Sequence, residues 1–172
     1  MSYGADWNLN LIESSAYHYA TSNTDSTWQA QSRYADGSQW SSSAAFISAL
    51  YNLNQNLSIS GGTRLNHIHM FTPIRYNGFN HDATWNFHAP SGSIGASYSK
   101  KSFKYFLNLS TGFRAPNVDD ASKVFDSQRG AVIVPNIDLR EERLYSTEIG
   151  MKHLLGKHLV MDASFYYSYL DN

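Results

Sequence analysis

Cysteine is absent from the 172-residue chain, and charged residues, proline and long apolar runs are scarce. Without cysteine, neither a disulfide framework nor a thiolate metal site can form. Only 16% of the residues are charged and the formal net charge is −1, so the composition gives no reason to expect nucleic acid as a partner. No apolar run approaches the roughly 18 residues of a membrane-spanning helix, which excludes helical spans but not membrane strands.

Alternation of apolar and polar residues is the main pattern that is present, and aromatic residues make up 15% of the chain. Such a period of two, sustained over the twelve residues of Phe103–Arg114, predicts a long strand with two different faces. About seven strands are predicted in this way: Tyr3–Ile12, Ser43–Leu53, Leu57–Met70, Phe87–Tyr98, Phe103–Arg114, Tyr145–His153 and Leu159–Leu170. No segment predicts a helix.

The length of these strands and the alternation of their connections indicate a membrane barrel. Twelve residues at about 3.3 Å each, tilted by about 45°, span about 28 Å, close to the apolar band of an outer-membrane barrel. We expect tight turns at residues 52–55, 99–102 and 154–157, and long polar loops at residues 14–42, 71–85 and 115–143. The sequence therefore predicts an all-β fold: an antiparallel meander of about seven long strands, an incomplete piece of a transmembrane β-barrel.

Three segments carry a resemblance to a known family. The stretches "STGFRAPNVDD", "GAVIVPNIDLREE" and "YSTEIGMK" resemble the TonB-dependent outer-membrane receptors, especially the Bacteroidetes type, and the resemblance covers nearly the whole chain. The residues that match the family pattern are Gly112, Phe113, Arg114, Ala115, Pro116, Asn117, Pro135, Asn136, Leu139, Glu142, Glu148 and Gly150. Glu141 departs from the pattern, because the family usually has proline there.

The resemblance implies active uptake of a scarce ligand, such as a ferric siderophore, haem, cobalamin or glycan, across the outer membrane of a Gram-negative cell. It also implies a plugged barrel of about 22 strands. We therefore expect residues 1–172 to be part of the barrel domain, with the plug domain, the TonB box and the remaining strands absent. The expected partners are outer-membrane lipid, a small-molecule ligand and, through the missing N-terminal part, TonB. No nucleic acid, cofactor or catalytic residue is expected.

The end of the strand at residues 103–114 predicts where its side chains point. Phe113 should lie on the lipid face at the upper aromatic girdle and Arg114 on the lumen side. Pro116 cannot donate to a β-ladder, so the strand should stop as the chain leaves the membrane. In the last three strands, the odd-numbered residues should share the apolar face.

The same reasoning predicts one ion pair. Arg114 and Glu142 both face the lumen side at the ends of neighbouring strands, so they should pair. Glu148, deeper in the lumen, should instead lie across from Ser110 and near Ser164.

Each pattern that suggests binding chemistry also has a simpler interpretation. His67 and His69 have the spacing by which a strand offers two imidazoles to a metal, but an exposed strand end also explains them. Asp119 and Asp120 could hold Ca²⁺, although a solvated acidic loop is favoured. The stretch "SGSIGAS" at residues 91–97 is interpreted as small residues along a strand rather than as a phosphate loop.

Two further groups of residues are candidates for a functional site. Glu141 and Glu142 could act as an acid–base pair, but adjacent residues on a strand point to opposite faces. The aromatic residues of the long loops could line the mouth of a ligand site or could anchor the loops; they are Trp28, Tyr34, Trp40 and Phe79.

Two other functions stay open as alternatives. One is a small outer-membrane barrel that acts on lipids, which requires a Ser/His set that the sequence does not clearly supply. The other is a soluble lipocalin-like barrel that binds a small apolar ligand; its outer face should be charged and its inner face apolar.

Overall fold

Seven long strands form one antiparallel sheet in the order β1-β4-β5-β6-β7-β10-β11. The computed structural model describes the whole chain except residues 20–26, 31, 33, 77–78, 123–125, 129–130, 133–137, 157 and 172. The strands are β1 (Ser2–Ile12), β4 (Ser38–Asn52), β5 (Leu57–Tyr76), β6 (Phe79–Lys100), β7 (Phe103–Arg114), β10 (Glu142–Leu155) and β11 (Leu159–Asp171). The predicted all-β meander is therefore confirmed.

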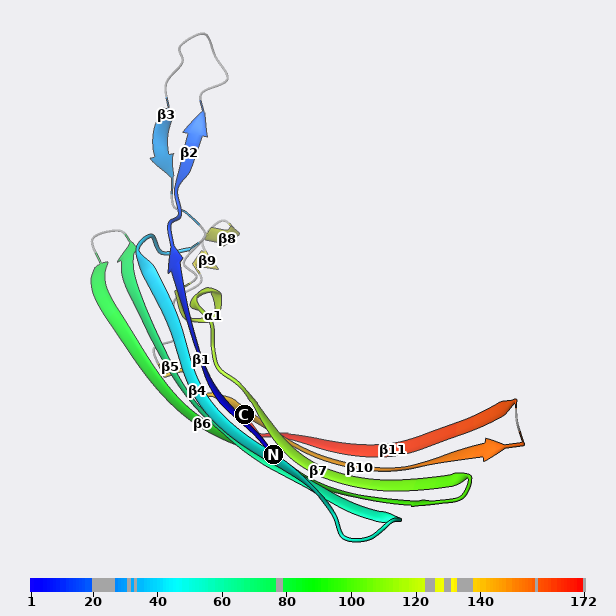
Figure 1. Cartoon of the computed structure of the whole chain (residues 1–172). Helices are drawn as coiled ribbons and strands as arrows, with labels where there is room; N and C mark the ends of the chain where they lie inside the picture. Colours follow the sequence, from blue (N-terminus) through cyan, green and yellow to red (C-terminus); the bar gives the residue numbers. More distant parts are fainter. Residues whose placement is uncertain are drawn as a thin grey trace.

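Small elements lie in the two long connections at one end of the sheet. They are β2 (Ala16–Tyr19), β3 (Thr27–Ala30), α1 (Val118–Ser122), β8 (Asp126–Gln128) and β9 (Ala131–Val132). The β2–β3 hairpin projects beyond the sheet, whereas α1, β8 and β9 lie on its concave side (Figure 1). The sequence analysis predicted no helix, so the five residues of α1 correct it. Within the described part of the chain, no helix is long and apolar enough to cross a membrane.

The expectation of a long loop at residues 71–85 is wrong. Residues 71–76 and 79–85 instead extend two strands, because β5 continues to Tyr76 and β6 begins at Phe79, directly paired with it. The sequence signal for this hairpin is Asn77-Gly78, a dipeptide typical of two-residue hairpin turns. The other two long connections run over residues 13–37 and 115–141, so residues 38–42 belong to β4 and not to the first expected loop. The opposite end of the sheet has short connections, at residues 53–56, 101–102 and 156–158.

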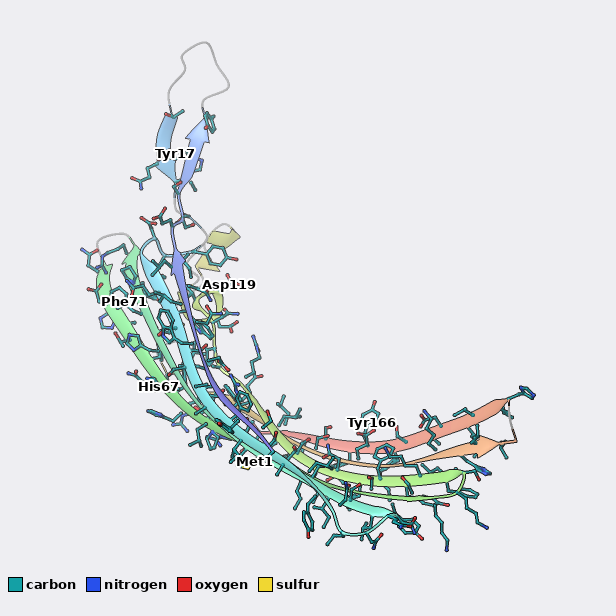
Figure 2. The ribbon with its side chains drawn as sticks, viewed as in Figure 1. Met1, Tyr17, His67, Phe71, Asp119 and Tyr166 are labelled. Carbon is teal, nitrogen blue, oxygen red and sulfur yellow. The ribbon has the colours of Figure 1, made fainter. Side chains whose placement is uncertain are left out.

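The strand register decides which residues share a face. Tyr145 pairs directly with Thr111 of β7 and with Tyr169 of β11. Directly paired side chains point to the same side, so the odd-numbered residues of these strands share one face, as predicted, with the exception of Phe113 at the end of β7. This face is convex and carries many exposed apolar residues, among them Trp7, Leu65, Ile94, Leu107, Ile149 and Phe165. In Figure 2, Tyr166, an even-numbered residue of β11, projects from the concave side instead.

Polarity inverts part-way along β5 and β6. Up to the pair formed by Leu65 and Pro90, the convex face of these strands carries exposed Ile59, Leu65 and Ile94. Beyond that pair, the convex face becomes mostly polar, with His67, His69, Asn86 and His88, and it also carries Phe71 and Pro73. The concave face changes in the opposite sense, because Ile68, Met70, Ile74, Ala83, Trp85 and Phe87 form a buried apolar cluster there with Val118 of α1. The upper sheet thus has a packed core on its concave side.

Two glycines let neighbouring backbones approach closely in the middle of the sheet. A Cβ atom on Gly62 would lie 3.0 Å from the carbonyl oxygen of Ile47 and 2.9 Å from the Cβ atom of Ser48. On Gly92 it would lie 2.9 Å from the carbonyl oxygen of Gly62. Glycines at such close approaches accompany strong bends in sheets, and the strands curve strongly in Figure 1.

Neighbouring glycines provide a matched test of this packing. In Gly62→Ala the new methyl group would meet backbone that cannot rotate away, so we expect the chain refolded in detergent to lose about 1–3 kcal/mol of stability. In Gly61→Ala the methyl group would lie 3.5 Å from the carbonyl oxygen of Ser93, an ordinary contact. Urea unfolding followed by gel mobility measures both variants, and equal midpoints would contradict the proposed backbone contact.

Candidate functional site

Arg114 lies at the end of β7 and joins three segments of the chain. Its Nη1 atom is 3.4 Å from Oε1 of Glu142, the first residue of β10, which is directly paired with it. Its Nη2 atom is 3.1 Å from Oδ2 of Asp120 in α1. The predicted pairing of Arg114 with Glu142 is therefore confirmed. The sequence analysis missed Asp120, since the strand pattern gives no distance between a loop residue and a strand.

Asn117 and Asp120 form a reciprocal cap at the start of α1. The Asn117 side chain accepts a hydrogen bond from the Asp120 backbone N–H at 2.9 Å, and Asp120 Oδ2 accepts one from the Asn117 N–H at 3.1 Å. This arrangement is a capping box, which satisfies backbone donors at a helix start. Asp120 therefore both caps α1 and binds Arg114, which favours a structural role over the calcium site considered from the sequence.

The apolar residues of the motif hold the same connection against the sheet. Val118 is only 3% exposed and belongs to the buried cluster on the concave face. Phe113, Ala115 and Leu139 pack against that cluster, and Pro116 is buried. The expectation that Phe113 lies on the lipid face is therefore wrong.

The separation of β6 from β7 explains the position of Phe113. Pairing between these strands ends at Gly92 and Thr111, where the Gly92 N–H donates to Thr111 Oγ1 at 3.0 Å. The next backbone group of β6 on that side belongs to Pro90, which has no N–H to donate. Above this point β7 pairs only with β10, so Phe113 packs against the cluster rather than standing on a continuous convex face.

Other residues of the family pattern have different structural positions. Glu148 pairs with Asn108 and Tyr166, so its expected position across from Ser110 is wrong by two residues, whereas Ser164 lies two residues from Tyr166 on the same face of β11.

The two glycines of the pattern differ in how tightly they are packed. Gly150 gives room to a ring, because a Cβ atom there would lie 2.3 Å from Cζ of Phe106. Gly112 is less confined, with 3.9 Å to Cβ of Leu144. Pro135 and Asn136 lie outside the described residues.

Glu141, which replaces the usual proline, forms its own ion pair. Its Oε1 atom lies 2.9 Å from Nη2 of Arg143, and this hydrogen bond lowers the pKa of the Glu141 carboxyl. Glu141 and Glu142 therefore engage two different arginines, an arrangement that does not favour an acid–base pair.

A pocket of about 420 Å³ opens beside α1. Its lining comes from β1, from the start of β4 and from both long connections: Asn10, Ile12, Tyr34, Trp40, Asn117, Val118 and Asp119. Figure 2 shows Asp119 on the concave side of the sheet. Tyr34 and Trp40 are two of the four aromatic candidates from the sequence; the side chains of Trp28 and Phe79 lie outside what the structure describes.

The remaining candidates lie away from this pocket. His67 and His69 share the convex face of β5, and His67 is paired with His88 across β6. In the part of the chain that the structure describes, no three residues of the types His, Cys, Asp and Glu gather closely enough to hold a metal. Residues 91–97 lie inside β6, which confirms their interpretation as part of a strand.

Substitution of Arg114 tests whether this residue holds the connection in place. Arg114→Ala removes both ion pairs, so we expect hydrogen exchange at the amides of Asn117 and Asp120 to become several-fold faster as the cap opens more often. Arg114→Lys keeps the positive charge but lacks the planar guanidinium group, so its exchange rates should lie between those of the wild type and of Arg114→Ala. Arg140→Ala serves as the matched control, and unchanged exchange in Arg114→Ala would refute this role.

Comparison with known proteins adds one finding. No curated protein matches the chain. A family model described as TonB dependent receptor-like, beta-barrel matches residues 1–172. This match covers every strand of the sheet and the motif around Arg114, and the seven-stranded antiparallel sheet fits part of such a barrel. The chain therefore belongs to the TonB-dependent receptor β-barrel family, whose members are outer-membrane transport receptors.

Proposed function

We propose that this chain forms part of the wall and the outer rim of a Bacteroidetes-type receptor that imports a scarce small molecule across the outer membrane with TonB. The observation that carries the proposal is the inversion of polarity at Leu65 and Pro90. Below this pair the convex face is apolar, as lipid requires, and above it that face is mostly polar, as water requires, although Phe71 and Pro73 also lie there. The pocket beside α1 lies on the concave side, with β1 and β4 contributing to its lining.

The extent of the apolar face supports this placement in a membrane. On β11 the convex face runs from Leu159 to Tyr169, ten steps of about 3.3 Å, or about 33 Å along the strand. A tilt of about 40° reduces this to about 25 Å along the membrane normal, which is the height of the apolar band on such barrels.

The pocket lining favours a neutral, polar ligand such as a glycan. Two aromatic rings offer stacking surfaces, and Asn10 and Asn117 offer amide groups that can donate and accept hydrogen bonds. The described lining contains no lysine or arginine, whereas a ferric siderophore or haem with several carboxylates would need cations.

The free edges of the sheet support a larger barrel. β1 and β11 each have one neighbouring strand in the sheet, so their outer edges carry backbone groups that require partners in lipid. We infer that further strands continue the wall and that a plug domain and a TonB box accompany it in the complete receptor.

The two alternative functions are less well supported. A lipocalin-like barrel should have an apolar inner face, but below Leu65 the apolar face is the convex one. The family assignment favours a transport receptor over a lipid enzyme.

Two tryptophans on opposite faces of neighbouring strands test the pocket. Trp40 lines it, whereas Trp7 of β1 lies on the exposed convex face. In the complete receptor we expect Trp40→Ala to weaken oligosaccharide binding at least tenfold, because a stacking surface is lost, and Trp7→Ala to leave binding unchanged. Calorimetry with neutral oligosaccharides and with an anionic ferric siderophore measures both variants. Tight binding of the siderophore, unaffected by Trp40→Ala, would overturn the proposed ligand class.

The apolar convex face leads to a prediction about the isolated chain. Exposed side chains such as Leu107, Ile149 and Phe165 form a surface too large for a monomer in water, and both sheet edges are free. We expect residues 1–172, expressed alone, to aggregate in plain buffer and to need detergent. Light scattering in both media measures this, and a monomer with a two-state melt in plain buffer would show that the convex face does not contact lipid.

A further inference from the structure

A group of histidines lies on the convex face of β5 and β6, just beyond the change in polarity. His67 is paired directly with His88, and the next pair along the strands is His69 with Asn86. Figure 2 shows His67 on the convex side, away from Asp119. The sequence spacing suggests only His67 and His69 as metal ligands, whereas the pairing of β5 with β6 brings His88 next to His67.

The backbone fixes the approach of His67 and His88. Their Nδ1 atoms lie 3.3 Å apart, and their ring centroids are separated by 4.6 Å. The carbonyl oxygen of His88 accepts a bond from Arg143 and so points away from β5. His67 and His88 therefore form a non-hydrogen-bonded pair of the β5–β6 ladder, the kind in which side chains come closest.

This separation is the one that two ligands of a tetrahedral metal require. Two imidazole nitrogens at about 2.0–2.1 Å from Zn²⁺ lie about 3.3–3.4 Å from each other. We propose that His67 and His88 bind a divalent transition metal, of the class of Zn²⁺, Ni²⁺ and Cu²⁺, through their Nδ1 atoms, with water completing the coordination. On binding, the ring that donates the Nδ1 hydrogen bond moves its proton to Nε2, so that both Nδ1 atoms present lone pairs.

The neighbouring charges allow a cation to bind there. Arg143 approaches His88, but its guanidinium is paired with Glu141 at 2.9 Å. His69 has its own partner, because its Nδ1 lies 3.0 Å from Oδ1 of Asn86. The described residues therefore supply two ligands. Cu²⁺ heads the order of affinities for imidazole sites, so it should bind most tightly once the two rings move closer together to suit its tetragonal geometry.

Copper titration of the complete receptor, purified in detergent without a polyhistidine tag, tests this site. We expect His67→Asn and His88→Asn each to weaken the tightest Cu²⁺ binding at least tenfold, and pulsed electron paramagnetic resonance to show two coordinated imidazoles in the wild type. His153→Asn is the matched control, because His153 also lies on the convex face but stacks on Phe103 at 3.7 Å. Gel mobility before and after heating checks that every variant is folded.

Three results would overturn the site. The first is unchanged Cu²⁺ affinity in folded His67→Asn and His88→Asn, and the second is a spectrum with one coordinated imidazole. The third is a loss in His69→Asn as large as that in His67→Asn, which would indicate a site along β5 instead of across the strands. None of these results depends on the ligand that the receptor imports, so the metal site and the proposed uptake function can fail separately.

Discussion

The alternation of side chains along the β-ladder is the constraint on which the other features depend. Because paired residues point to the same side, the register between β7 and β10 assigns Leu107 and Ile149 to one face and Arg114 and Glu142 to the other. A slip of one residue would exchange the faces of the whole strand. It would place residues such as Lys104 against lipid, at a cost of about 2–4 kcal/mol for a basic residue at the membrane centre and of about 0–1 kcal/mol near the interface, where Lys104 lies beside the short turn.

The same ladder explains why the motif around Arg114 lies where β7 separates from β6. Pro90 has no N–H to offer to β7, and the two strands separate above Gly92 and Thr111. The chain after Arg114 then turns onto the concave face, where Val118 joins the apolar cluster and Asp120 joins Arg114. The motif thus fastens a long connection to the rim of the sheet. The ion pairs and the cap of this motif need no ligand to explain them, whereas the adjoining pocket has a separate set of aromatic residues.

The sequence was sufficient for features that depend on alternation alone. Period-two patterns located all seven long strands, and parity assigned Arg114 and Glu142 to one face. Features that depend on absolute register were out of reach, because a long loop leaves the offset between two strands free. The expected partner of Glu148 was wrong by two residues for this reason.

For the β5–β6 hairpin, in contrast, a short connection makes the register predictable from the sequence. In the sequence, Asn77-Gly78 is typical of a two-residue hairpin turn, and the strand offset that such a turn predicts pairs His67 with His88, as the ladder does. The sequence pattern did not predict that β5 and β6 continue as one hairpin, because polarity inverts along them. Beyond Leu65 the apolar residues lie on the other face, and the pattern no longer resembles a membrane strand. Phe113 was misplaced for a related reason: parity predicts its face only while β7 has a neighbour on both sides.

On the concave face below the pocket, two aromatic side chains lie flat against the sheet instead of projecting into the lumen. Gly4 pairs with Phe46 and Gly150 with Phe106, and in both pairs a Cβ atom on the glycine would lie within 2.9 Å of the ring. The rings therefore lie over the glycine backbone instead of projecting, an arrangement known to stabilise sheets at glycine.

Polar side chains then cover one of these rings. Arg64 lies 5.9 Å above the centre of the Phe46 ring and is held by Asp6 at 2.7 Å. The glycines of the wall thus let large aromatic residues lie close to the sheet on the concave face, which leaves space on that side, as a barrel that encloses a plug and passes a solute requires.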